Sequence, residues 1–270
     1  MIKDLRILGK DIQVDINGDY YGEDFWTKIS NNRWEPDTFN FISTYCDSST
    51  HFLDIGAANG AMSLAAAIKG ANVTSYEPDP IIFSVLKRNV ELNENLSKLI
   101  QLKNGGISSK SGLIKFDISS DPEIFSGILF RNRTFEQSEI EVLGLSEQVS
   151  EYGLLSKKVI IKMDIEGAEF KILNNLTVLR TLEKFDVLML LAIHPGFNRQ
   201  YKKSKFNKKI SEKMWRKSNI RESLEIFSVI QQFANIFRTN LNPVKSKENF
   251  ASLVDAGYHE FIIDFSRSRI

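Results

Sequence analysis

The segment from residue 51 to residue 77 constrains the fold more than any other part of the chain. A short apolar run at 51–55 ends abruptly at Gly56, and an alanine-rich helical pattern follows at 61–68. A second apolar run then ends in Glu77. This order of strand, glycine turn, helix and strand is typical of the first part of a parallel α/β sheet.

The glycines of this turn, Gly56 and Gly60, favour a bound ligand. Glycine allows positive φ angles and lets a ligand approach a backbone that carries no Cβ. The free N–H groups at the start of the following helix then face that ligand. An acidic residue at the end of the second strand, here Glu77, can accept hydrogen bonds from both hydroxyls of a ribose. The segment therefore predicts a nucleotide-type cofactor.

The glycine spacing distinguishes between cofactors. A dinucleotide site needs G-x-G-x-x-G around a pyrophosphate, whereas here Gly56 and Gly60 are separated by three residues and Asp54 precedes them. The carboxylate of Asp54 would repel a pyrophosphate, but it suits the ammonium end of a methionine, directly or through water. We therefore predict S-adenosylmethionine. A nicotinamide or flavin cofactor, or a turn in which the glycines only cap the helix, are the alternatives.

Composition limits the classes of protein to which the chain can belong. The chain has 270 residues, 42% of them apolar and 26% charged, which is enough for one large α/β domain or a domain with an elaboration. One cysteine, Cys46, excludes an intramolecular disulfide and is expected to be buried, and the three histidines show no zinc-site spacing. The N-terminal residues contain no apolar leader, and the longest apolar run, 187–193, is too short to span a membrane. We expect a soluble, cytoplasmic protein.

Hydrophobic periodicity predicts βα repeats after a short N-terminal extension. We expect an α/β fold with a seven-stranded, mostly parallel sheet and helices on both faces. The extension, 1–46, should contain a hairpin and a helix, and the main domain, 47–270, should carry a helical insertion at about 197–246. The predicted strands lie at 51–55, 72–77, 99–103, 157–163, 186–193 and 259–265, with an added strand at 113–118, and the predicted helices at 60–69, 80–95, 139–152, 168–176 and 247–256.

A second cluster of acidic residues lies in the segment 160–169, Ile-Ile-Lys-Met-Asp-Ile-Glu-Gly-Ala-Glu. Asp164 is placed at the carboxyl end of a predicted strand, at the edge where open α/β sheets bind ligands. Three acids within six residues can also simply complement a helix dipole. The segment alone does not separate these two interpretations.

Together, the glycine turn, the Glu77-Pro78 pair and the segment 160–169 resemble the FkbM family of S-adenosylmethionine-dependent methyltransferases. That family has a D-[IV]-G-A-N-x-G loop, an E-P turn and an I-K-x-D-[IV]-E-G-x-E segment in this order. The resemblance covers about residues 34–195 and extends to the closing segment 247–265. Here Asn59 stands one position later than the family often places it, and the basic insertion after His194 does not match the common core.

The resemblance implies a class I methyltransferase fold with a Rossmann-like sheet and assigns roles to individual residues. Family members whose role is known or proposed mostly O-methylate sugars or other secondary-metabolite hydroxyls. The implied contacts are Asp54, Gly56, Ala57, Asn59 and Gly60 with the methionine half, Glu77 with the ribose, Pro78 and Asp79 shaping its turn, Asn104, Gly105, Gly106 and Ile107 with the adenine, and Asp164, Glu166 and Gly167 beneath the methyl donor and the acceptor.

The predicted catalytic residues follow from the chemistry of the acceptor group. An alcohol must lose its proton as the new bond forms, whereas amino methylases of this fold usually carry an N-P-P-Y-like tetrad where this chain has 164–167. O-methylation is therefore favoured, with His194 or Asp164 as the base; a purely structural His194 is the alternative. Asp164, Glu166 and His194 together would also suit a divalent cation. Since no spacing enforces such a site, we predict no metal.

The basic stretch 199–221 contains ten lysines and arginines and one acid. It favours an anionic acceptor such as a nucleotide sugar, a phosphorylated glycan or a lipid-linked intermediate at a membrane surface. The predicted acceptor-binding residues are Glu166, His194, Lys202 and Lys203. A solvated helical lid is the alternative, and nucleic acid is disfavoured because no RNA-binding motif accompanies the lysines.

We therefore predict an S-adenosylmethionine-dependent O-methyltransferase that acts on a hydroxyl of a sugar, glycan or nucleotide sugar. Two alternatives stay open at this point. One is an RNA methyltransferase that uses the stretch 199–221, and the other is a cofactor-binding module that docks on a glycan-assembly complex.

Overall fold

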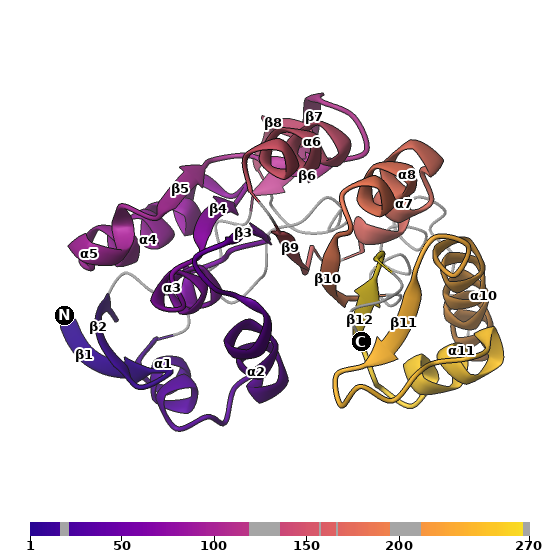
Figure 1. Ribbon diagram of the computed structural model, residues 1–270, viewed down its shortest axis with the longest axis horizontal. Coiled ribbons are helices and arrows are strands. Elements are labelled where there is room, and N and C mark those ends of the chain that lie inside the picture. Colours follow the sequence, from indigo (N-terminus) through magenta and orange to yellow (C-terminus); the bar gives the residue numbers. More distant parts are fainter. Residues whose placement is uncertain (17–21, 119–135, 157, 166, 195–211, 267–270) are drawn as a thin grey trace. The chain divides into compact units, whose positions relative to one another are not determined.

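A computed structural model describes residues 1–270 except 17–21, 119–135, 157, 166, 195–211 and 267–270 (Figure 1). The chain divides into two compact units. Unit 1 comprises Met1–Gly106 and Glu151–Lys162, and unit 2 comprises Ile107–Ser150 and Met163–Ile270. The predicted division into an extension, 1–46, and a main domain, 47–270, stays a prediction.

The main sheet has seven strands and is mostly parallel, so the predicted α/β fold class is confirmed. Strands β3, β4 and β5 run parallel to one another, while β12 is antiparallel to both β10 and β11. Their order is β11 (Asn235–Arg238), β12 (Glu260–Asp264), β10 (Leu188–Ala192), β9 (Lys158–Met163), β3 (Thr50–Ile55), β4 (Asn72–Tyr76) and β5 (Ile100–Lys103).

Unit 1 begins with an antiparallel hairpin of β1 (Ile2–Ile7) and β2 (Lys10–Asp15). All six residues of β3 are buried, as expected for a strand inside a parallel sheet. Cys46 is buried too, as predicted, and burial raises the pKa of its thiol to about 12. The helices of this unit are α1 (Gly22–Ser30), α2 (Pro36–Tyr45), α3 (Ala61–Ile68), α4 (Pro80–Glu91) and α5 (Glu94–Ser97).

Unit 2 contains most of a small second sheet, in which β7 and β8 pair antiparallel. Its strand order is β6 (Gly106–Ser108), β8 (Glu136–Gly144) and β7 (Gly112–Ile118). Helix α6 (Leu145–Leu155) follows β8 directly and continues into unit 1 from Glu151. The other helices among the described residues of unit 2 are α7 (Glu169–Leu173), α8 (Leu176–Lys184), α10 (Glu212–Ile230) and α11 (Lys247–Asp255). Among the helices of the described residues, none combines the length and the apolar character that crossing a membrane requires.

The predicted helix at 139–152 is wrong in its first part, because 139–144 belongs to strand β8. The side chains there alternate: Glu139 and Glu141 are exposed and Val142 is buried. This period of two is a strand pattern, and β8 pairs with β7 along its length, for example at Ile140 with Ile114. The helical propensity of the glutamates and of the following leucines masks the alternation in the sequence.

The insertion predicted as helical at 197–246 also contains a strand, β11. Its four residues are held by antiparallel pairing with β12, and Ile236 and Phe237 are buried. A run of four residues is too short for a periodicity to appear in the sequence. The predicted strand at 113–118 does form, as β7, but it lies in the three-stranded sheet, so β11 is the seventh strand of the main sheet.

Candidate functional site

In unit 1, the turn after β3 is fixed to the end of β4 by main-chain hydrogen bonds. The N–H groups of Gly56 and Ala57 both donate to the carbonyl of Tyr76, at 3.1 and 3.0 Å. Within the turn, the Gly60 N–H donates to the Ala57 carbonyl at 2.9 Å. Gly60 has a φ of 91°, which glycine adopts without strain. The sequence therefore forms the predicted strand, turn and helix.

Asp54 lies at the base of this turn and is fully buried. Its Oδ2 accepts a hydrogen bond from Ser63 Oγ at 2.6 Å, and Ser63 Oγ lies 2.7 Å from Ser75 Oγ. These contacts link β3, α3 and β4. The predicted contact of Asp54 with a methionine ammonium stays a prediction.

Glu77 bridges two loops with its carboxylate. Oε2 accepts the N–H of Ala58 at 3.0 Å, and Oε1 accepts the N–H of Asp79 at 2.9 Å. The residue is 8% exposed, and burial raises the pKa of Glu77 to about 8, although these two N–H groups and the Lys162 ammonium act in the opposite direction. A carboxylate oxygen can accept more than one hydrogen bond. Each oxygen therefore keeps acceptor capacity for a ribose hydroxyl.

Three further residues complete this group of loops. Asn104, after β5, donates from Nδ2 to the carbonyl of Glu77 at 2.9 Å, and the Gly105 N–H donates to the same carbonyl at 3.2 Å. Lys162, a residue of β9, donates from Nζ to the carbonyl of Gly56 at 3.3 Å. Sequence reasoning gave Lys162 no role, and only its place in the I-K-x-D motif distinguishes it.

The donor set of unit 1 fits S-adenosylmethionine. A carboxylate at the end of β4 and a glycine turn after β3 stand at the carboxyl ends of neighbouring parallel strands, where open α/β sheets bind nucleotides. Of the predicted cofactor residues, the structure brings together Gly56, Ala57, Asn59, Gly60, Glu77, Pro78, Asp79, Asn104 and Gly105 around these loops. Gly106 begins β6, and Ile107 is a buried residue of that strand.

In unit 2, a buried carboxylate connects the residues that follow β9 and β10. Glu169 is fully buried; its Oε2 accepts the N–H of Gly167 at 2.7 Å, and its Oε1 accepts the N–H of His194 at 2.6 Å. This contact fixes the backbone of His194, a predicted site residue. Sequence reasoning named no role for Glu169, although it is the last acid of the segment 160–169.

The side chains of His194 and Asp164, the predicted catalytic pair, lie next to each other. His194 Nε2 is 3.6 Å from Asp164 Oδ1, and His194 Nδ1 is 3.6 Å from Glu169 Oε1. Both His194 and Asp164 keep about a quarter of their side chains exposed (23% and 25%). The ring of His259 lies parallel to that of His194, with centroids 6.5 Å apart. Burial, and then the charge of His194, lower the pKa of His259.

Three predicted acceptor-binding residues, Glu166, Lys202 and Lys203, lie outside the described residues. Within the described part of the chain, no group of three or more His, Cys, Asp or Glu side chains is arranged to hold a metal ion. The predicted alternative of a metal bound by Asp164, Glu166 and His194 is therefore not tested.

Among the described residues of the basic stretch 199–221, Arg216 and Arg221 are paired within unit 2. Arg216 Nε donates to Asp255 at 2.7 Å, which joins α10 to α11. Arg221 Nε lies 3.7 Å from Glu225 Oε1 on the same helix. These two arginines therefore already have acidic neighbours within the chain.

Comparison with known proteins gives a family and several relatives. The model of the methyltransferase FkbM domain matches residues 54–231. A hexuronic acid methyltransferase, AglP of Haloferax volcanii, is 26% identical over 175 residues, which are 64% of this chain and 68% of that protein. The ribosomal protein L11 methyltransferase of Heliobacterium modesticaldum is 27% identical over 85 residues, 30% of this chain and 27% of that protein.

Solved structures are similar at lower identity. The O-methyltransferase from Bacillus cereus in complex with SAH has 11% identity and a TM-score of 0.40, and the match covers 85% of this chain and 80% of that one. A SAM-dependent methyltransferase from Agrobacterium tumefaciens has 12% identity and a TM-score of 0.39, with 75% and 56% covered.

Proposed function

The chain belongs to the FkbM family of S-adenosylmethionine-dependent methyltransferases, and we propose that it methylates a hydroxyl group of a sugar, glycan or nucleotide sugar. The observation that carries the choice of a hydroxyl is the imidazole of His194, placed between the carboxylates of Asp164 and Glu169. The choice of a sugar is supported by the similarity to a hexuronic acid methyltransferase over 64% of the chain.

The residues of unit 1 would hold the cofactor. Glu77 would accept the ribose hydroxyls, the turn 56–60 with Asp54 would face the methionine end, and 104–106 would border the adenine. When bound, S-adenosylmethionine supplies a methyl group that is already activated by its sulfonium. The contribution of the protein is then mainly to hold the reacting groups in line, a matter of proximity and orientation.

The residues of unit 2 would act on the acceptor. A hydroxyl must lose its proton as the new C–O bond forms, and His194 would take that proton on Nε2. The carboxylates of Asp164 and Glu169, each 3.6 Å from a ring nitrogen, would stabilise the imidazolium that results. Asp164 would also orient the acceptor hydroxyl. Glu169, through its hydrogen bond with the His194 backbone, would keep the ring in place.

The basic stretch 199–221 would serve an anionic acceptor or a partner in glycan assembly. Lys202 and Lys203 are the residues proposed for this role, whereas Arg216 and Arg221 already have acidic neighbours within unit 2. Neutralising those lysines should weaken acceptor binding without changing the affinity for S-adenosylhomocysteine.

The test has two parts on one preparation. Calorimetric titration with S-adenosylhomocysteine, in EDTA and in Mg²⁺, should give binding that does not depend on the metal; no binding would reject the cofactor assignment of residues 54–79. Methyl transfer to nucleotide sugars, oligosaccharides and hexuronic acids should then give a methyl ether. A product cleaved by mild base would be a methyl ester formed on a carboxylate, which would reject the hydroxyl assignment.

The same assay separates the alternatives. Transfer to RNA but to none of the sugars, with the steep salt dependence of phosphate contacts, would favour an RNA methyltransferase. Cofactor binding without transfer to any acceptor would favour a docking module. In that case, partner binding would survive Asp164→Ala but fail when Lys202 and Lys203 are neutralised.

A further inference from the structure

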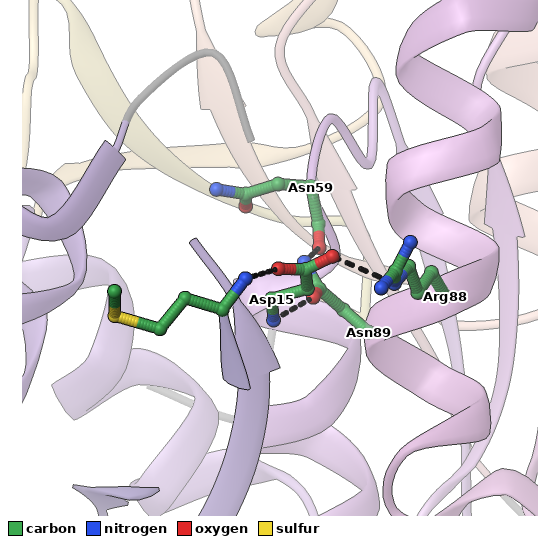
Figure 2. Close-up of polar contacts among 5 residues, drawn as sticks. Asp15, Asn59, Arg88 and Asn89 are labelled. Carbon is green, nitrogen blue, oxygen red and sulfur yellow. Dashed lines mark hydrogen bonds and ion pairs between the residues drawn. The ribbon is translucent and has the colours of Figure 1, made fainter. Parts of the chain in front are cut away.

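One buried amide joins the N-terminal hairpin to the turn after β3 (Figure 2). Asn89, on α4, is fully buried; its Oδ1 accepts the N–H of Asp15 at 2.9 Å and its Nδ2 donates to the carbonyl of Asn59 at 3.0 Å. Asp15 is the last residue of β2, and its carboxylate also contacts Arg88 Nε at 2.7 Å and the Met1 amino nitrogen at 2.8 Å. A single side chain thus bridges two backbone segments.

The chemistry of this bridge is specific to asparagine. Both of its partners are main-chain groups with fixed roles, an N–H of Asp15 and a carbonyl of Asn59. Rotating the amide by half a turn would place two donors against each other at one end and two acceptors at the other. Aspartate could serve the Asp15 end but would oppose the Asn59 carbonyl. A buried polar group without a partner is costly, so position 89 has to supply one acceptor and one donor.

On the side of the turn, the bridge fixes one peptide plane. Asn89 holds the carbonyl of Asn59, and the N–H of the same peptide, that of Gly60, is held by the Ala57 carbonyl at 2.9 Å. This peptide leads directly into α3, which begins at Ala61. Without Asn89, the Asn59 carbonyl would lose this hydrogen bond, and the peptide would rotate more easily because it precedes a glycine, the residue type that resists rotation least.

On the side of the hairpin, a second asparagine of α4 serves as a comparison. Asn93 lies one turn after Asn89 on the same face of the helix. Its Oδ1 accepts the N–H of Gln13 at 2.9 Å, and its Nδ2 donates to the Gln13 carbonyl at 2.8 Å. Asn89 and Asn93 therefore bind alternate residues of β2, but of the two only Asn89 has a hydrogen bond to the turn among the contacts of the described residues.

We propose that Asn89 is a positioning residue for the cofactor: held by Asp15 on one side, it fixes the Asn59–Gly60 peptide of the turn on the other. The inference rests on the proposed assignment of the turn 56–60 to the methionine end of the cofactor. The proposal adds a buried residue of α4 to the determinants of cofactor affinity, and it gives the hairpin a role in holding that residue.

The test compares Asn89→Asp with Asn93→Ala by calorimetric titration with S-adenosylhomocysteine and by thermal unfolding. Asn89→Asp keeps the acceptor for Asp15 and places an acceptor against the Asn59 carbonyl, so the Kd should rise by about tenfold. Asn93→Ala removes a contact between the same helix and strand, and its Kd should stay within about twofold of wild type. Equal weakening by both variants, or a wild-type Kd for Asn89→Asp, would overturn the proposal.

A measurement on the wild type keeps the proposal testable if Asn89→Asp does not fold. Coupling between two sites acts in both directions. Hydrogen exchange of individual amides can be followed by NMR with and without saturating S-adenosylhomocysteine. The ligand should slow exchange of the Asp15 and Gly60 amides more than exchange of the amides in β7. Equal protection in β7 and at these two amides would contradict the inference. Failure of the wild type to bind S-adenosylhomocysteine would instead reject the proposed function.

Discussion

Cofactor affinity should rise with pH from about 6.5 to about 8.5, because Glu77 has to be ionised to accept both hydroxyls of the ribose. Burial raises the pKa of Glu77 to about 8 in the protein without ligand. At pH 7 most of the free protein therefore carries a protonated Glu77, and binding has to release this proton. The sign follows: affinity falls as pH falls below about 8 and levels off above it.

The size of this effect follows from the distance between the assay pH and the pKa. Ionising a group one pH unit below its pKa costs about 1.4 kcal/mol, which corresponds to about a tenfold difference in Kd between pH 7 and the plateau. Just under one proton per bound ligand should be released at pH 7. Calorimetry in two buffers of different ionisation enthalpy measures this number directly.

The ligand for this assay should be 5′-methylthioadenosine, which keeps the ribose but lacks the titrating amino-acid end of S-adenosylhomocysteine. Glu77→Gln should remove the pH dependence. It should also weaken binding by about 1.5–3 kcal/mol at pH 8.5, because a charge-assisted hydrogen bond is lost. The glutamine also provides a single oxygen for the two N–H groups of Ala58 and Asp79. Glu91→Gln, the same exchange at an exposed position of α4, should change neither quantity.

Three results would refute this reasoning. A wild-type Kd that does not change with pH, together with no proton release, would show that Glu77 does not ionise on binding. Weaker binding at higher pH would contradict the sign. An unchanged affinity of Glu77→Gln would reject the ribose assignment altogether.

Three further predictions concern single residues. His194→Ala should leave the Kd for S-adenosylhomocysteine unchanged but slow turnover about 100-fold or more; an unaffected rate would leave His194 a structural role. Glu169→Gln should lower the free energy of unfolding in urea by about 1–3 kcal/mol, because Gly167 or His194 loses its acceptor; an unchanged midpoint would be contrary evidence. Gly60→Ala should destabilise more than Gly257→Ala. Both glycines have a φ near 90°, but a Cβ at Gly60 would lie 2.7 Å from Leu86 Cδ1 and one at Gly257 would meet nothing within 4 Å; equal unfolding midpoints would refute the argument.

Much of the cofactor site could be predicted because its determinants are local. A glycine turn after an apolar strand, and an acid at the end of the next strand, are visible in a short window of sequence, and the structure places Gly56, Gly60 and Glu77 in one group of loops. Strand β8 could not be predicted, for the opposite reason. Its partner strand β7 lies elsewhere in the sequence, and pairing with β7 overrides the helical propensity of the glutamates in β8.

Asn89 illustrates the same difficulty within the site. In the sequence it is one polar residue on an amphipathic helix, and such residues usually face water. Its full burial depends on the approach of β2 and of the turn after β3, 74 and 30 residues away. No window of sequence around position 89 contains either partner.

Glu77 and Glu169 show why the acids of this chain could be found in the sequence while their main-chain partners could not. Each is a buried carboxylate whose two oxygens accept main-chain N–H groups from two places: Glu77 from Ala58 and Asp79, Glu169 from Gly167 and His194. Burying a carboxylate is costly unless hydrogen-bond donors replace water. Each of these two carboxylates therefore needs both of its N–H donors. One donor of each pair is two residues away, but the other lies 19 or 25 residues along the chain. The pairing of strands in the sheet brings that distant donor to the carboxylate. The motif around the acid does not contain it.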